Sequence, residues 1–313
     1  MNPRVSILVP VFNRADLLPE CLESALAQTM SGLEVVVVDG ASTDGTWDVC
    51  CEFAAQDERI RPVREESNSG PVAGWTRCLA EARGTYGTFL WSDDLLRPQF
   101  LESTLPFLLA ADVGFAFTAA EIGPAPGAGA IHYSRETGRF ASESFVAAAL
   151  RYPGALPVSP ACALFRLDDL RAAMTPVLPT TPPVDLGWTG AGTDLLLYLR
   201  TAQRYASVAS VKEPLAFFRA HPGSISVQGR GGLVRLHYAL ARAWFATTRT
   251  DKRSVEECLA RHWLSDMWAR RRVVMPWSAT RNYVGMVSAW TLVMASIRFV
   301  GTIVRNRRVA LQW

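Results

Sequence analysis

Four short apolar runs within the first 91 residues constrain the fold of this chain most strongly. They span residues 6–11, 33–39, 60–64 and 86–91, and the second, LEVVVVD, contains four consecutive β-branched valines. Between them lie segments with the apolar spacing of helices, at about 15–28, 46–55 and 71–83. Dense apolar strands that alternate with helices are typical of βαβ units. We therefore expect an α/β protein with a mostly parallel central sheet.

Polar residues follow three of these predicted strands. Asp39 ends the second strand, Asp93 and Asp94 follow the fourth, and the turn Pro10-Val11-Phe12-Asn13 follows the first. Ligands of open parallel sheets bind at the carboxyl ends of the strands, so these residues are expected to line one crevice. Taken singly, each acid has a simpler explanation as a helix cap.

The adjacent carboxylates of Asp93 and Asp94 repel each other and favour a nearby cation. Mg²⁺ and Mn²⁺ prefer such oxygen ligands, and Mg²⁺ often combines one or two carboxylates with substrate phosphates. Neither GxGxxG nor GxxxxGK[ST] follows the first strand. This argues against a dehydrogenase or a P-loop protein. The sequence predicts a metal site that would neutralise the phosphates of a nucleotide.

Several motifs occur in a fixed order along residues 5–229, and together they resemble the family 2 glycosyltransferases with the GT-A fold. The matching segments are VSILVPVFNR (5–14), VDGASTDGT (38–46), NSG (68–70), ARGTYGTFLWSDD (82–94), GTDLLLYLR (192–200) and FRAHPGSIS (218–226). Each motif is weak alone, but their order over more than 200 residues is specific. The resemblance implies an inverting transferase that uses a nucleoside-diphosphate sugar.

The resemblance also implies roles for the donor-side residues. Asp39 would accept a hydrogen bond from a pyrimidine base, with Pro10 to Asn13 packed around that base. Asp93 would contact the ribose or the metal, and Asp94 would bind the metal that bridges the diphosphate. His221 would contact the diphosphate or the metal. Arg219 is either a phosphate contact or a plain strand residue, and the sequence leaves both open.

On the acceptor side, the resemblance implies that Asp194 is the general base. A carboxylate at the start of an amphipathic helix also suits the helix dipole, which is the simpler explanation. Trp188 either stacks on an acceptor sugar or belongs to the core. The chain departs from the family at Trp91, where many relatives have an aspartate. Phe12 replaces a frequent tyrosine, and Thr193 replaces an acidic residue.

The end of the chain differs in composition from the rest. Residues 261–313 contain nine arginines and one acidic residue, a net charge of +8, so the first 260 residues carry −5 of the total of +3. The basic charge is therefore local, which argues against a general nucleic-acid surface.

Helices are expected at 233–247, 255–272 and about 279–305. The uncharged stretch 282–297 would be about 24 Å long as a helix, short of the ~30 Å hydrocarbon core. We expect it to lie on a membrane surface; the alternative is packing on the catalytic region or a partner chain.

These features predict three regions: a nucleotide-sugar-binding half (1–122), an acceptor-binding half with the base (123–230), and a helical, basic, tryptophan-rich region (231–313). Six cysteines without metal spacing, and no export signal, favour a cytoplasmic protein that associates peripherally with the inner face of the plasma membrane.

The predicted activity is transfer from a UDP- or dTDP-sugar, with Mn²⁺ or Mg²⁺, to a saccharide or lipid-linked hydroxyl in cell-surface polysaccharide or glycolipid synthesis. Two alternatives are a sugar-1-phosphate nucleotidyltransferase and a catalytically silent membrane scaffold.

Overall fold

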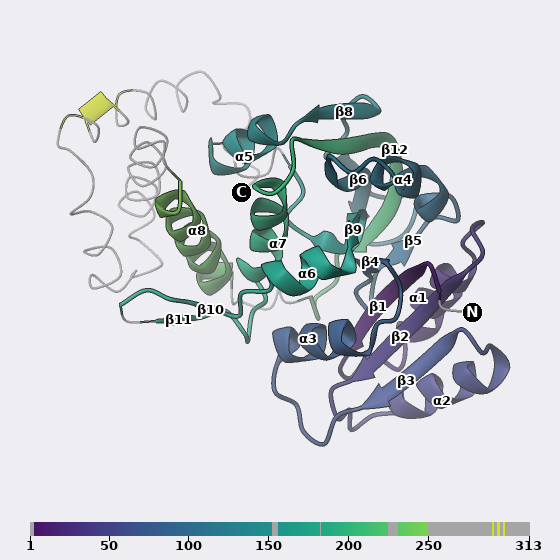
Figure 1. The fold of residues 1–313 in the computed structure, drawn as a ribbon. Helices are drawn as coiled ribbons and strands as arrows, with labels where there is room; N and C mark the ends of the chain where they lie inside the picture. Colours follow the sequence, from purple (N-terminus) through teal and green to yellow (C-terminus); the bar gives the residue numbers. More distant parts are fainter. Residues whose placement is uncertain are drawn as a thin grey trace.

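The computed structural model describes residues 3–151, 156–181, 183–224 and 231–249, with four helical residues at 290, 293, 294 and 297. A ten-stranded sheet crosses the centre of this part in the order β3-β2-β1-β4-β9-β6-β12-β5, with β7 paired to β6 and β8 to β12 (Figure 1). The strands are β1 (Val5–Val11), β2 (Leu33–Asp39), β3 (Ile60–Arg64), β4 (Tyr86–Phe89), β5 (Leu95–Leu96), β6 (Val113–Gly123), β7 (Ala130–His132), β8 (Gly138–Ala141), β9 (Ala163–Arg166) and β12 (Ser207–Arg219).

Helices cover both faces of the sheet (Figure 1). They are α1 (Leu18–Leu26), α2 (Thr46–Gln56), α3 (Pro71–Glu81), α4 (Phe100–Leu108), α5 (Ser142–Arg151), α6 (Leu167–Ala173), α7 (Thr193–Ala202) and α8 (Gly231–Thr247), with a short 3₁₀ turn at Pro160–Cys162. A separate two-stranded ribbon joins β10 (Val177–Leu178) to β11 (Val184–Asp185).

The sheet is parallel where the sequence predicted βαβ units. β1 pairs in parallel with both β2 and β4, and β2 pairs in parallel with β3. β9 then runs antiparallel between β4 and β6, and β12 returns parallel to β6. The carboxyl ends of β1, β2 and β4 therefore lie at one edge, beside the end of β12.

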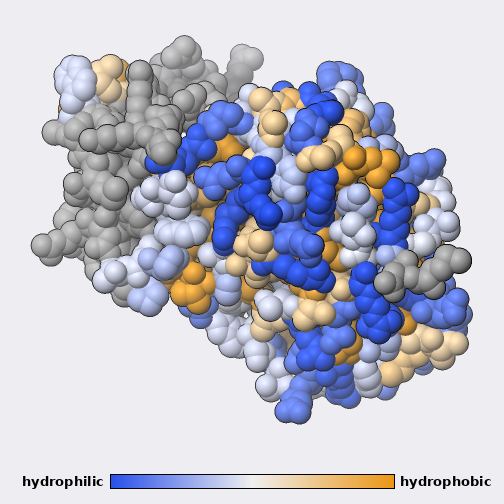
Figure 2. Space-filling view, viewed as in Figure 1, coloured by the Kyte–Doolittle hydropathy of each residue, from blue (hydrophilic) through white to orange (hydrophobic). Residues whose placement is uncertain are grey.

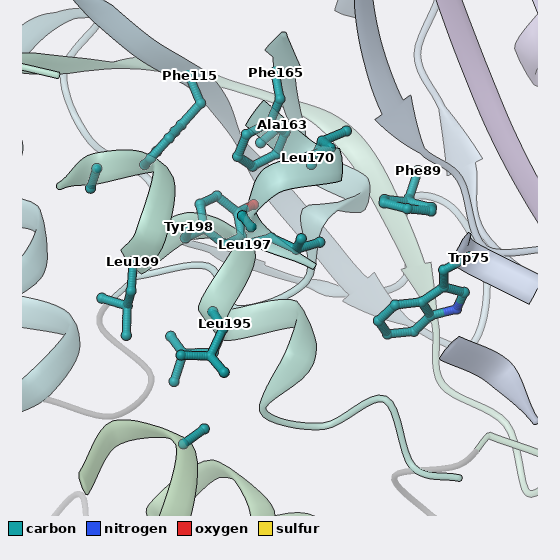
Figure 3. Packing of buried hydrophobic residues seen from close by; sticks show 14 of the residues in the cluster. Trp75, Phe89, Phe115, Ala163, Phe165, Leu170, Leu195, Leu197, Tyr198 and Leu199 are labelled. Carbon is teal, nitrogen blue, oxygen red and sulfur yellow. The ribbon is translucent and has the colours of Figure 1, made fainter. Parts of the chain in front are cut away.

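Both faces of the parallel strands are buried because successive side chains point to opposite sides. On β1, Ile7 and Val9 pack with α1 and α4, whereas Leu8 packs with α3 and the helices of the second half. Around Tyr198, the rings of Phe115 and Phe165 approach to centroid distances of 5.0 and 5.2 Å (Figure 3). A core filled on both faces fixes the strand ends in place.

The predicted α/β architecture is confirmed, and α8 corresponds to the helix predicted at 233–247. The glycine- and proline-rich stretch 123–138 contains β7, and the stretch 175–192 contains the β10–β11 ribbon. The helices predicted at 255–272 and 279–305, with the basic tail, lie outside the described residues apart from four positions. Among the described helices, none has the length and apolar character needed to cross a membrane. Hydrophilic residues cover much of the face in Figure 2.

Candidate active site

A cleft of about 840 Å³ opens at the carboxyl ends of the parallel strands. This volume lies within the range of sites that enclose a drug-sized ligand. The predicted site residues that line it are Pro10, Val11, Phe12, Asn13, Asp93, Asp94, Trp188, Asp194 and Arg219. Segments from both halves of the sequence therefore meet at one cavity.

The turn after β1 is held by the turn after β2. Asn13 has a positive φ of 50°, and its backbone N–H donates to Ser42 Oγ at 2.9 Å. The N–H of Thr43 donates back to Asn13 Oδ1 at 2.9 Å, and the N–H of Arg14 donates to Thr46 Oγ1 at 2.8 Å. These bonds satisfy backbone groups that the sheet leaves unpaired and hold Phe12 and Asn13 at the cleft.

Asp39 is fully buried at the end of β2. Its carboxylate accepts hydrogen bonds from the backbone N–H and the hydroxyl of Ser42, and Arg64 Nε lies 3.5 Å from Oδ2. Its neighbours Val38 and Gly40 line the cleft. In this arrangement Asp39 supports the wall of the cleft through Ser42.

Asp94 is buried beside the second carboxylate of the pair. Its Oδ1 accepts a hydrogen bond from the backbone N–H of Arg219 at 2.8 Å. Burial, and then the charge of Asp93, raise the pKa of Asp94 well above its usual range. This environment favours either a proton or a cation next to the carboxylate.

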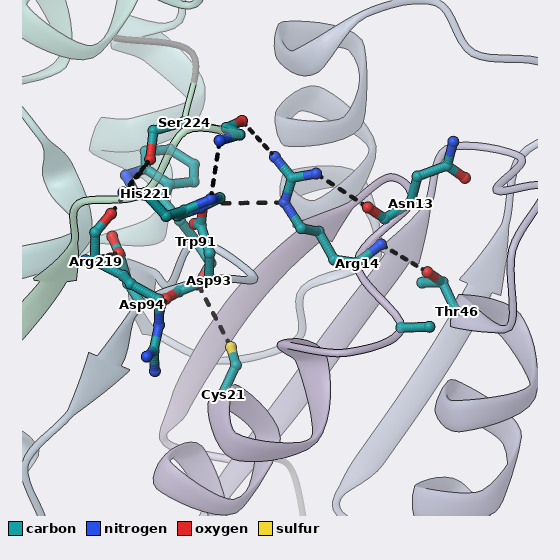
Figure 4. A network of polar contacts seen from close by, with 12 residues as sticks. Asn13, Arg14, Cys21, Thr46, Trp91, Asp93, Asp94, Arg219, His221 and Ser224 are labelled. Carbon is teal, nitrogen blue, oxygen red and sulfur yellow. Dashed lines mark hydrogen bonds and ion pairs between the residues drawn. The ribbon is translucent and has the colours of Figure 1, made fainter. Parts of the chain in front are cut away.

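Asp93 contacts residues from two other segments, the turn after β1 and the loop after β12 (Figure 4). Its Oδ2 lies 2.9 Å from Nε2 of His221, on the loop after β12, and 4.0 Å from Nε of Arg14. The guanidinium of Arg14 also donates to the carbonyls of Asn13 and Gly223, each at 3.0 Å. Arg14 therefore links the turn after β1 to the loop that carries His221.

Arg219 turns its guanidinium toward protein groups. Its Nε donates to the backbone carbonyl of Asp93 at 3.0 Å, and its Nη2 donates to Glu20 at 2.5 Å. Of the two explanations left open by the sequence, this geometry favours a strand residue that braces the carboxylate loop.

The residues at this edge fit a divalent cation. Asp93 Oδ2 and His221 Nε2 share a hydrogen bond of 2.9 Å, so a cation bound by both would replace the proton between them. Asp94 adds a buried carboxyl group whose pKa is raised by burial and by Asp93. Within the described residues, no group of three or more His, Cys or acidic side chains is arranged to hold a metal ion. Phosphates and water would therefore complete the coordination, as Mg²⁺ commonly allows.

Asp194 lies buried near the start of α7, on the lining of the same cleft. Its Oδ1 accepts hydrogen bonds from the backbone N–H groups of Gly192 and Leu195 at 2.9 and 2.6 Å, and its Oδ2 accepts one from the hydroxyl of Tyr238. Burial raises the pKa of Asp194 to about 7, against these hydrogen bonds, which lower it. A carboxylate with a pKa near neutrality is well matched to general base catalysis.

Two tryptophans in the lining have different roles. Trp91 is partly buried. Its ring packs at a tilt against Trp75 and stacks on Phe89, at centroid distances of 4.8 and 5.5 Å, and its Nε1 donates to Ser159 Oγ at 2.8 Å. Trp91 is thus an apolar residue in the lining of the cleft. Trp188 is 54% exposed and packs over Gly70, which has a φ of +91°. It is not a core aromatic.

Arg14 and Tyr238 are two site residues for which the sequence predicted no role. Arg14 ends the segment VSILVPVFNR, and its position just after the first strand is the one sequence signal for a role in the site. Tyr238 lies in the middle of an amphipathic helix, 44 residues beyond Asp194, and no local pattern distinguishes it from a packing residue.

Comparisons with known proteins identify the family of this chain. The sequence model of glycosyl transferase family 2 matches residues 6–172. The putative teichuronic acid biosynthesis glycosyltransferase TuaG of Bacillus subtilis is 37% identical over 117 residues, covering 37% of this chain and 46% of TuaG. Glycosyltransferase GlyG of Streptococcus pneumoniae is 33% identical over 103 residues, covering 33% of this chain and 34% of GlyG. The chain thus spans less than half the length of these relatives.

The fold also resembles a solved structure. Residues 1–349 of TarS from S. aureus, crystallised in complex with UDP-GlcNAc, superpose with a TM-score of 0.70 at 16% identity, over 92% of this chain and 82% of the TarS chain. This likeness confirms the GT-A fold predicted from the motifs. The family model covers more than half of the sequence, including both strand ends that carry the turn and the carboxylate pair. The chain belongs to glycosyl transferase family 2.

Proposed function

We propose that this chain transfers a sugar from a UDP- or dTDP-sugar to a hydroxyl acceptor, with inversion at the anomeric carbon. The observation that carries the proposal is the presence, in one cleft, of Asp194 and of the Asp93–Asp94 pair. Asp194 is a carboxylate with a pKa of about 7, suited to take a proton. The acidic pair, with His221, offers a place for the cation that a diphosphate needs.

The donor would bind in the half of the cleft formed by Pro10 to Asn13. Phe12 is 40% exposed there and offers a ring for a base to pack against. Asp39 lies buried next to this turn. It would either accept a hydrogen bond from a pyrimidine or hold the turn in place through Ser42.

Asp93 and His221 would hold Mg²⁺ or Mn²⁺, with Asp94 as a third ligand or as a buried charge next to it. When bound, the cation supplies Lewis-acid stabilisation of the leaving diphosphate. The chain itself keeps these side chains in place: the backbone N–H of Arg219 holds Asp94, and Arg14 holds the His221 loop.

Transfer would be one direct displacement. Asp194 takes the proton of the acceptor hydroxyl while that oxygen bonds to the anomeric carbon, and the bond from this carbon to the diphosphate oxygen breaks. The electron pair leaves with the nucleoside diphosphate. A positioned base contributes roughly 10²- to 10⁴-fold to the rate of such a step.

The acceptor would enter past Trp188, whose exposed ring suits stacking on a sugar. The name of TuaG refers to teichuronic acid, a cell-surface polysaccharide, and we propose a saccharide or lipid-linked acceptor of that general kind. The basic, tryptophan-rich residues 261–313 would hold the enzyme at the inner face of the plasma membrane.

The test is a transfer assay with a panel of nucleotide sugars and Mn²⁺ or Mg²⁺, reading nucleoside diphosphate released in the presence of saccharide and lipid-linked acceptors. We expect release with a uridine or thymidine donor. If the wild-type protein consumes no donor across the panel, the enzyme proposal fails and a silent subunit is favoured.

The membrane proposal has its own test, flotation with liposomes that contain anionic lipids. The full chain is expected to float, whereas a variant ending at Thr250 should remain at the bottom. Equal flotation of both would contradict the role of the tail.

A further inference from the structure

Helix α8 packs directly against the segment that carries Asp194. Thr189 Oγ1 and Nδ1 of His237 lie 2.6 Å apart, and both residues are buried. Gly192 has a φ of +92°, and a Cβ there would lie 3.0 Å from both the Cβ of Ala241 and the carbonyl oxygen of His237. A side chain at position 192 would therefore collide with α8. The segment before α7 therefore packs closely against α8.

The hydroxyl of Tyr238 extends this contact to the carboxylate itself. It donates to Oδ2 of Asp194 at 2.5 Å, and the ring lies in the lining of the cleft. The other oxygen, Oδ1, already accepts two backbone hydrogen bonds, from Gly192 and Leu195. Oδ2 is therefore the oxygen with capacity left to accept a proton from a substrate, and Tyr238 fixes its direction.

We infer that Tyr238 is a positioning residue for the catalytic base, and that α8 is consequently part of the active site although it lies beyond the family-matched residues 6–172. This inference rests on the proposed role of Asp194. Tyr238 acts through Asp194: by donating to Oδ2 it holds the carboxylate in one rotamer and stabilises its ionised form. A charge-assisted hydrogen bond of this kind is stronger than a neutral one.

Other titratable or charged groups lie around Asp194 and are left unchanged by a substitution at Tyr238. On α8, the positive charge of Arg242 favours the ionised carboxylate. The tyrosines Tyr133, after β7, and Tyr198, on α7, lie within electrostatic range of Asp194, and Cys162 lies near both. These four groups are the same in Tyr238→Phe and in the wild type, so a difference in pH profile between the two proteins reports on the Tyr238 hydroxyl.

The experiment compares Tyr238→Phe with the wild type in steady-state transfer assays between pH 5.5 and 9. The ring stays, so packing is kept, and only the hydroxyl is removed. We expect kcat to fall roughly 10- to 100-fold, the effect of losing one hydrogen bond to a charged group, with the donor KM unchanged. The acidic limb of the kcat profile should move to higher pH, because the lost bond favoured the ionised form.

Tyr205→Phe is the matched control. The hydroxyl of Tyr205 donates to Oδ2 of Asp169 at 2.7 Å, and neither residue lines the cleft. This variant also loses a tyrosine–carboxylate bond, so it measures the general cost of such a loss. Its kcat and pH profile should match those of the wild type, and thermal unfolding with nucleotide-binding measurements verifies that both variants are folded.

A double-mutant comparison separates this inference from the proposed function. In the Asp194→Asn background, Tyr238→Phe should cause no further loss, because the ionisable carboxylate through which Tyr238 acts is already removed. Wild-type kcat and pH profile in Tyr238→Phe, or an additive loss in the double variant, would overturn the role of Tyr238 while leaving Asp194 as the base. Full transfer by Asp194→Asn alone would instead contradict the proposed function.

Discussion

Nε2 of His221 lies 2.9 Å from Oδ2 of Asp93, although 128 residues separate them in the chain. The contact joins the loop after β4 to the loop after β12, and Arg14 bridges the same two segments from the turn after β1. Three segments far apart in sequence thus form one polar cluster at the edge of the sheet. Its chemistry suits a divalent cation and an anionic ligand.

The first prediction concerns metal dependence. Chelation should abolish transfer, and Mn²⁺ or Mg²⁺ should restore it. His221→Ala should raise the metal concentration for half-maximal activity by at least about 10-fold, since it removes one of the few protein ligands. His132→Ala, at an exposed histidine on β7, is the control and should behave as the wild type. Full activity of the wild type in excess chelator would refute the metal site.

The second prediction concerns the pH dependence of the rate. Burial raises the pKa of Asp194 to about 7, and the base acts only when ionised. The value of kcat/KM should therefore fall about 10-fold per pH unit below this pKa. A profile that stays flat down to pH 5 would mean that Asp194 does not take the proton.

The same ionisation affects folding stability. The pKa of Asp194 is about 7 in the folded protein, above its ordinary value of 3.8, so folding favours the protonated side chain. The resulting stabilisation of the folded state is fully present below about pH 4 and is lost as the pH rises through about 7. Asp194→Asn should therefore gain stability relative to the wild type between pH 5 and pH 8. Urea unfolding of both proteins at these two pH values measures the change, and a constant difference would contradict it.

Another prediction concerns Trp91, where the family resemblance leads one to expect an aspartate. Its ring packs on Trp75 and Phe89, so an aspartate there would leave a gap and a poorly solvated charge. Trp91→Asp should lower the free energy of unfolding by about 3 kcal/mol or more without improving metal affinity. Trp91→Phe should cost only about 1 kcal/mol, for the lost bond to Ser159. Tighter metal binding by Trp91→Asp would show that this side chain faces the cation.

The parallel half of the fold was predictable because β1 to β4 are dense apolar runs with helical segments between them. In the second half, α7 and α8 were predictable from their apolar spacing, but the strands were not. β12 contains Lys212, Glu213 and Pro214, and its pairing with β6 shifts register there, so no strand pattern marks it in the sequence. α4 contains Pro106, which also obscures a helix.

The candidate site was predictable where a residue lies at a strand end, as Asn13 and Asp93 do. Contacts between distant segments were not predictable. Nothing local indicates that Tyr238 bonds Asp194, or that Arg219 directs its guanidinium to Glu20 instead of the cleft. Such pairs depend on the folded arrangement of α8 and β12, and a single sequence does not encode them as a pattern.

The most direct test of the account compares transfer and nucleotide binding in Asp194→Asn and Asp94→Ala. Asp194→Asn should lose about 10²- to 10⁴-fold in kcat while binding nucleoside diphosphate and metal as the wild type does. Asp94→Ala should lose metal-dependent nucleotide binding as well as transfer. Full transfer by Asp194→Asn, or unchanged metal-dependent nucleotide binding by Asp94→Ala, would contradict the division of the cleft into a base and a cation site.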